Sequence, residues 1–132
     1  TDPSTSAYYL NGSPNSTTIT LANNSINNQF GGDFVSYVFA EDISGVIKCA
    51  SGTNDVAENI GFEPDLIIFR AQTGTGDWYL MDSDRGWDKV VKMNASDAET
   101  TTASPITTSA TGFTIPSGLL GSNYIYMALK HS

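Results

Sequence analysis

Short apolar runs separated by turn residues dominate this chain, and no segment carries apolar residues at the spacing of an amphipathic helix. The clearest runs are Asp65–Arg70, which lies between Pro64 and a glycine-containing turn, and Tyr124–Leu129. Runs of roughly four to eight residues bounded by turns are typical of β-sandwiches and barrels. The sequence therefore predicts an all-β protein, folded as an antiparallel β-sandwich of jelly-roll-like or immunoglobulin-like type in a single compact domain.

The predicted strands and connections follow from these runs. We expect strands at residues 17–21, 33–41, 43–49, 65–70, 78–81, 89–93, 112–115 and 124–129. We expect polar connections at residues 51–61 and 96–110, and a flexible N-terminal arm at residues 1–7, which leaves residues 8–132 for the sandwich. The strand at 33–41 is apolar on both faces, which favours a central position in its sheet.

Two segments of the chain share one residue pattern. Gly31–Ala40 and Gly121–Lys130 each run through small residues, Asp or Asn, an aromatic residue and then alternating apolar residues. They lie roughly 90 residues apart, and self-similarity at such a distance indicates repeated building blocks. We expect the two segments to occupy equivalent, central positions in the sheets.

The composition excludes several partner classes. Charged residues make up only 15% of the chain, and the net charge is −8. This charge argues against a basic patch for nucleic acid or anionic lipid. No apolar run approaches the ~20 residues of a membrane span, and the polar start at Thr1–Ser4 predicts neither a leader nor membrane insertion. Cys49 is the only cysteine, so no intrachain disulfide can form, and we expect it to be buried.

The densest acidic segment suggests a calcium site. Asp82, Asp84 and Asp88 alternate with other residues in a predicted loop, and Ca²⁺ prefers six to eight oxygen ligands. The spacing departs from that of an EF-hand loop because Arg85 intervenes. The alternative is a surface turn in which Arg85 pairs with one or two of the aspartates.

The two tryptophans suggest a sugar-binding surface. Trp78 and Trp87, with Asp84 and Asp88 nearby, could offer an aromatic platform and hydroxyl partners to a glycan. This hypothesis expects that Trp87→Ala abolishes glycan binding and leaves the fold intact. The alternative places Trp78 in the core or at a subunit interface.

Catalytic groups are sparse. His131 is the only histidine and lies next to the last residue, where we expect it to be solvated and unable to build a triad or a metal cluster. Fourteen acidic residues allow a glycosidase-like carboxylate pair by chance alone. We therefore expect a protein that is not an enzyme and needs no cofactor.

Four segments together resemble a known family. Gly61–Arg70, Gly76–Arg85 and Asn123–Ala128 occur in the order seen in a tandem β-repeat of uncharacterised function from tailed-phage structural proteins, and Phe34–Glu41 is similar to the strand that opens its next unit. The similarity covers roughly residues 8 to 130.

The resemblance implies a structural role in a virion. We expect a non-enzymatic tail-fibre or appendage domain on the particle surface, which forms a trimer or an array and attaches to other virion proteins. A capsid decoration protein and a host-recognition module that binds surface glycans are the alternatives.

Overall fold

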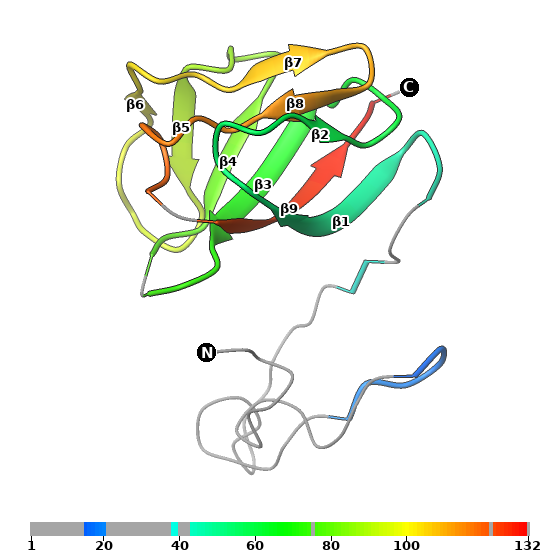
Figure 1. Ribbon diagram of the computed structural model, residues 1–132. Coiled ribbons are helices and arrows are strands. Elements are labelled where there is room, and N and C mark those ends of the chain that lie inside the picture. Colours follow the sequence, from blue (N-terminus) through cyan, green and yellow to red (C-terminus); the bar gives the residue numbers. More distant parts are fainter. Residues whose placement is uncertain (1–14, 21–37, 40–42, 75, 122, 132) are drawn as a thin grey trace, which may run out of the picture. The chain divides into compact units, whose positions relative to one another are not determined.

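The computed structural model describes residues 15–20, 38–39, 43–74, 76–121 and 123–131 (Figure 1). The chain divides into two compact units, Thr1–Phe39 and Ala40–Ser132, and every described strand lies in the second unit. The described residues form two antiparallel sheets and no helix, which confirms the all-β prediction. The predicted arm at residues 1–7 and its boundary at residue 8 lie outside the described residues.

The larger sheet has six strands, and the last strand of the chain lies between the first strand and β3. In spatial order the strands are β1 (Ile47–Gly52), β9 (Tyr124–Leu129), β3 (Leu66–Ala71), β4 (Tyr79–Asp82), β5 (Lys89–Lys92) and β6 (Thr100–Thr101). β9 pairs over six residues with β1 on one side and over six residues with β3 on the other. The predicted central position of the Tyr124–Leu129 segment is therefore confirmed.

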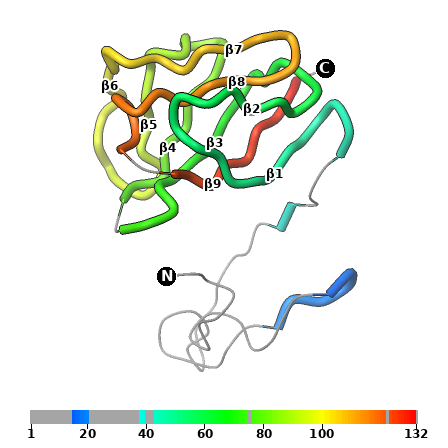
Figure 2. Tube along the Cα trace, in the orientation of Figure 1, coloured from blue at the N-terminus to red at the C-terminus, as the bar shows by residue number. Residues whose placement is uncertain are grey.

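The smaller sheet has three strands and covers one face of the larger sheet. Its order is β2 (Glu58–Asn59), β8 (Gly112–Thr114) and β7 (Thr107–Ser109). Figure 2 shows the chain leaving β8 in the small sheet and entering β9 in the large one. The two layers form the predicted β-sandwich.

The core lies between the two sheets. Ile67, Phe69 and Met81 of the large sheet are fully buried, and the ring of Phe113 from β8 meets the ring of Tyr126 edge-on at 5.0 Å. Edge-to-face aromatic contacts of this kind add to the gain from burying apolar area. Tyr124 is also fully buried, and this burial raises the pKa of its phenol.

Gly112 allows β2 and β8 to approach closely. A Cβ atom at this position would lie 1.8 Å from the carbonyl oxygen of Glu58, which is much less than any side chain tolerates. Glu58 in turn accepts a hydrogen bond from the Tyr124 hydroxyl at 3.5 Å, which links β2 to the centre of the large sheet. The small sheet thus depends on a residue without a side chain at position 112.

Four predicted strand residues near the N-terminus do not form a strand. The Asn15 side-chain oxygen accepts hydrogen bonds from the backbone N–H groups of Thr17 and Thr18, at 2.9 and 2.8 Å. Such a local turn competes with strand pairing, so the prediction of a strand at 17–21 is wrong over residues 17–20. In the segment predicted at 33–41, Val38 and Phe39 are exposed and outside any strand, and residues 33–37, 40 and 41 lie outside the described residues.

The start of β1 differs from the prediction by four residues. Ile43–Val46 form a turn in which Gly45 has a φ of +72°, a conformation that favours glycine. The strand therefore begins at Ile47. Cys49 within it is half-buried, which corrects the expectation that it is buried.

Three very short strands were not predicted. β2 lies in the expected connection at 51–61, and β6 and β7 lie in the threonine-rich segment at 96–110. Each has two or three residues, so no alternation of apolar and polar residues could indicate it.

We predict that Gly112→Ala destabilises the sandwich by about 3 kcal/mol, because the new methyl group collides with the backbone of β2. Urea denaturation monitored by circular dichroism measures the change. Gly121→Ala is the matched control, since a Cβ atom there meets nothing within 4 Å. Equal stabilities for the two variants would contradict the close approach of β2 and β8.

Candidate functional site

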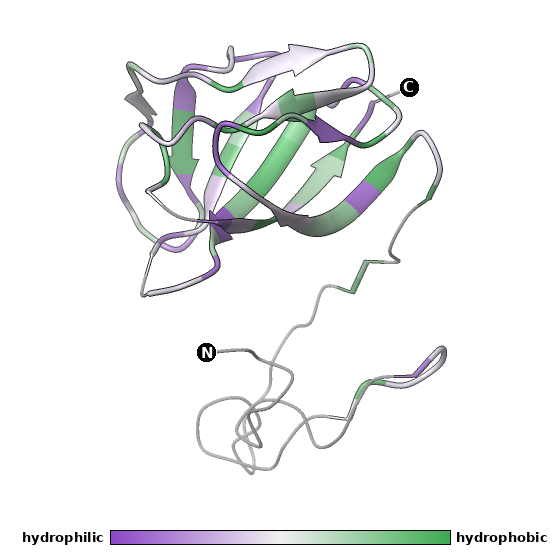
Figure 3. Cartoon of the chain, viewed as in Figure 1, coloured by the Kyte–Doolittle hydropathy of each residue, from purple (hydrophilic) through white to green (hydrophobic). Residues whose placement is uncertain are grey.

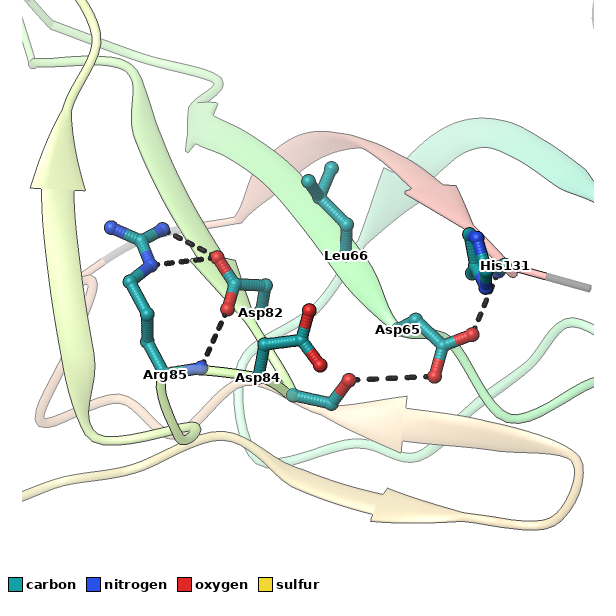
Figure 4. Close-up of a pocket in the computed structure, with 7 residues that line it drawn as sticks. Asp65, Leu66, Asp82, Asp84, Arg85 and His131 are labelled. Atoms are coloured by element: carbon teal, nitrogen blue, oxygen red, sulfur yellow. Dashed lines mark hydrogen bonds and ion pairs between the residues drawn. The ribbon is translucent and has the colours of Figure 1, made fainter.

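A hollow of about 750 Å³ lies where β4 ends and its following loop begins (Figure 4). Its lining combines residues from the start of β3, the end of β4, the next loop and the chain's C-terminal segment. These residues are Asp65, Leu66, Asp82, Ser83, Asp84, Arg85 and His131. The hollow includes Asp82 and Asp84 from the predicted acidic segment.

Asp82 and Arg85 form the main ion pair of the hollow. The Asp82 carboxylate accepts hydrogen bonds from the Arg85 backbone N–H at 2.9 Å and from its guanidinium Nε at 2.8 Å. A second guanidinium nitrogen reaches Glu99 at 3.1 Å. These hydrogen bonds lower the pKa of Asp82 and raise that of Arg85. This geometry matches the alternative to the calcium site, which is a surface turn in which Arg85 pairs with an aspartate.

Asp65 holds the other side of the hollow. Its carboxylate accepts hydrogen bonds from the Ser83 hydroxyl at 3.4 Å and from the His131 backbone N–H at 2.7 Å. The His131 side chain is exposed, as predicted. Figure 4 shows the Asp84 carboxylate projecting between Asp82 and Asp65. The polar groups here tie the start of β3, the loop after β4 and the C-terminal segment together.

The calcium hypothesis receives no support from the described residues. Asp82 is engaged by Arg85, and Asp88 pairs with Lys89 at 3.1 Å. Within residues 43–74, 76–121 and 123–131, no three His, Cys, Asp or Glu side chains are grouped so that they could hold a metal ion. The Asp82, Asp84 and Asp88 site therefore remains a sequence-based prediction.

The two tryptophans are both half-buried and lie in different surroundings. Trp87 packs against the buried core, and its backbone carbonyl accepts a hydrogen bond from Ile106 at 3.1 Å. Trp78 is half-buried and lies just before the start of β4, where the Arg70 guanidinium is 5.9 Å from the centre of its ring. The two tryptophans proposed for a glycan platform therefore do not form one surface. Trp87 supports the core, whereas Trp78 lies on the side of the sheet away from the core.

The far side of the large sheet carries an apolar surface that sequence reasoning did not identify as a site. The strand register places alternate residues of β1, β9, β3, β4 and β5 on the side away from the core. We call this surface the outer face; it comprises Ile47, Cys49, Ser51, Leu66, Ile68, Arg70, Trp78, Leu80, Asp82, Lys89, Val91, Met93, Ile125, Met127 and Leu129. Figure 3 shows hydrophobic residues along β3 and β9 at the centre of the sheet.

The middle row of the outer face is apolar across five strands. It consists of Cys49, Met127, Ile68, Leu80 and Val91, all of them half-buried. Every described strand belongs to one of the two sheets, and the small sheet packs on the opposite face. The continuous apolar runs in the sequence were a signal for this surface, because a strand that is apolar on both faces requires a cover on both.

The fold and these surfaces define a small antiparallel β-sandwich domain, in which the small sheet is the one described layer that packs on the large sheet. The whole chain, residues 1–132, matches the family described as a domain of unknown function, DUF7483, and the chain belongs to that family. No curated protein and no solved structure matches it. Among the described residues, no helix could cross a membrane.

We predict that Asp82→Asn lowers stability by about 1 kcal/mol at neutral pH, because it removes charge-assisted hydrogen bonds to a partly solvated Arg85. The folded-state pKa of Asp82 lies below its ordinary value of 3.8. The stabilisation is therefore complete above that value and is lost as the pH falls through the lower folded-state pKa. Urea denaturation at neutral and acidic pH measures it.

Asp84→Asn is the matched control, because it removes the same charge from a carboxylate outside the Arg85 hydrogen bonds. A difference between the two variants that persists unchanged at acidic pH would contradict a role for the charged Asp82.

We also predict that Trp87→Ala destabilises the fold by about 3 kcal/mol, whereas Trp78→Ala costs less than about 1 kcal/mol. Trp87 fills space against the core, whereas Trp78 contacts Arg70 at the edge of the outer face. Thermal denaturation of the two variants compares them directly. A Trp87→Ala variant that is more stable than Trp78→Ala would contradict the packing role of Trp87 and would favour a surface role for it.

Proposed function

We propose that this chain is a non-enzymatic structural component of a tailed-phage virion, most specifically a tail-fibre or other appendage domain on the particle surface. It acts by self-assembly and by attachment to other virion proteins. The observation that carries this proposal is the outer face, whose five-residue middle row is apolar and lies opposite the covered core. Large apolar faces of this kind are used for association between proteins.

The polar surfaces also support a structural role. The ion pairs and hydrogen bonds of the hollow run between β3, β4 and the loops, so they stabilise the fold. The resemblance of Gly61–Arg70 and Gly76–Arg85 to repeats of phage structural proteins gives the setting. In the structure these segments contain β3 and β4, which contribute central columns of the outer face.

The experiment is to locate the chain on the particle. Antibodies raised against the purified chain are applied to virions of the phage that encodes it and viewed by electron microscopy. We expect label on the tail or its fibres, and label on the head would instead indicate a capsid decoration protein. If the chain remains with the soluble proteins and is absent from purified virions, the proposal fails.

A carbohydrate-binding module is the second candidate, and the position of Trp78 supports it. Trp78 directly precedes β4, and Asn94 and Asp77 are adjacent, since Asn94 accepts a hydrogen bond from the Trp78 backbone N–H and donates one to Asp77. A sugar stacked on the ring would compete with Arg70. This candidate predicts that Trp78→Ala abolishes binding to host glycans on an array while thermal stability is retained. Unchanged binding would exclude Trp78.

A further inference from the structure

An arginine and a tryptophan lie side by side at one end of the outer face. Arg70 belongs to β3, and Trp78 directly precedes β4. The register of these two antiparallel strands places the residues opposite one another. The Arg70 guanidinium lies 5.9 Å from the centre of the Trp78 ring, which is within the range of a cation–π contact. The pair therefore presents a positive charge and an aromatic ring at one place.

Hydrogen bonds hold the Arg70 side chain and the Trp78 backbone in position. The Arg70 guanidinium donates to the backbone carbonyl oxygens of Gly76 at 3.0 Å and of Gly74 at 3.4 Å. The Trp78 backbone N–H donates to the Asn94 side-chain oxygen at 2.8 Å. Groups that are fixed before a ligand arrives lose little conformational freedom when it binds, so this pair is preorganised for binding.

Arg70 has no carboxylate partner among the described residues. Three other basic side chains do pair with carboxylates, and these are Arg85, Lys89 and Lys92. Arg70 instead uses two of its five guanidinium N–H donors for carbonyl oxygens, which leaves three for a ligand. An arginine without a carboxylate is notable in a chain whose acidic residues outnumber its basic ones by 14 to 6.

We propose that Arg70 and Trp78 form a binding site for an acidic sugar, with the sugar carboxylate on Arg70 and the sugar ring beside Trp78. Hydrogen bonds between a guanidinium and a carboxylate are roughly twice as strong as those between neutral groups. A neutral sugar stacked on the indole must displace Arg70, whereas an acidic sugar keeps the Arg70–Trp78 contact and gains an ion pair. This inference rests on the carbohydrate-binding candidate and specifies its class of sugar.

The charges close to the pair permit an anionic ligand, although the whole chain is acidic. Ile125, the neighbour of Arg70 on β9, carries no charge. The carboxylate of Asp77 lies 3.2 Å from the Lys92 ammonium, so its charge is already compensated. Repulsion from more distant carboxylates is screened, because the Debye length is about 8 Å at physiological ionic strength.

The test titrates the full chain with a tetrasaccharide of galacturonic acid and with the methyl ester of the same tetrasaccharide, which lacks the charges. Isothermal titration calorimetry at physiological salt measures both affinities. We expect the acid to bind at least tenfold more tightly than the ester.

Two substitutions of Arg70 test its part in this binding. We expect Arg70→Gln to weaken binding of the acid at least tenfold, and Arg70→Lys to weaken it at least threefold, because lysine keeps the charge and lacks the planar guanidinium. Lys130→Gln is the matched control, since it removes the same charge from an exposed side chain just beyond the other end of β9. We expect it to change binding less than twofold. Thermal denaturation confirms that the variants are folded.

The possible results separate this site from the function on which it rests. Equal binding of acid and ester, or an Arg70→Gln variant with unchanged affinity, would overturn the site. Neutral glycans that bind through Trp78 without Arg70 would overturn the acidic class and leave the carbohydrate-binding candidate standing. A short polyglutamate peptide that binds as tightly as the tetrasaccharide would overturn recognition of the sugar. If neither acidic nor neutral glycans bind, the site and the carbohydrate-binding candidate both fail.

Discussion

The pairing of β9 with β1 and β3 at the same time is the constraint on which the described fold depends. Six-residue ladders on both sides of this strand join β1 to the β3–β6 part of the large sheet. Its inward residues Tyr124, Tyr126 and Ala128 lie in the core, and Tyr126 meets Phe113 of the small sheet. Without β9, the large sheet would separate into two parts and the small sheet would lose its main contact.

The same strand also explains why the large sheet is apolar on the side away from the core. Residues of a strand alternate between two faces, so a strand that buries aromatic residues on one side and carries Ile125, Met127 and Leu129 on the other is apolar throughout. The side-chain hydrogen bonds described for Asp82 and Asp65, by contrast, lie at the ends of strands and in loops, which they hold together. The two faces of the large sheet therefore differ in surroundings, since one packs on the small sheet and the other lies on the side away from the core.

Much of the fold could be predicted because its long strands are continuously apolar. β3 and β9 were placed to within one residue, since runs of large apolar residues between turns leave few alternatives. The short polar strands could not be predicted from the sequence. The two threonines of β6, for example, form a strand because they pair with Lys89 and Val90 of β5, and their own residue types carry no strand pattern. The Asn15 turn and the position of Trp87 likewise depend on contacts that composition does not record. The outer face was visible in the sequence only as apolar residues on both sides of a strand.

The place of β9 in the chain also sets the order in which the domain can fold. Strands β3, β4, β5 and β6 follow one another and pair with their neighbours, so they can form as soon as they are synthesised. β1 must wait, because Gly52 pairs with Tyr124 across roughly 70 residues, and closing so long a loop is slow. During that interval β1 and β3 each lack the strand that β9 places between them. The large sheet is therefore completed only after the last strand of the chain has been made.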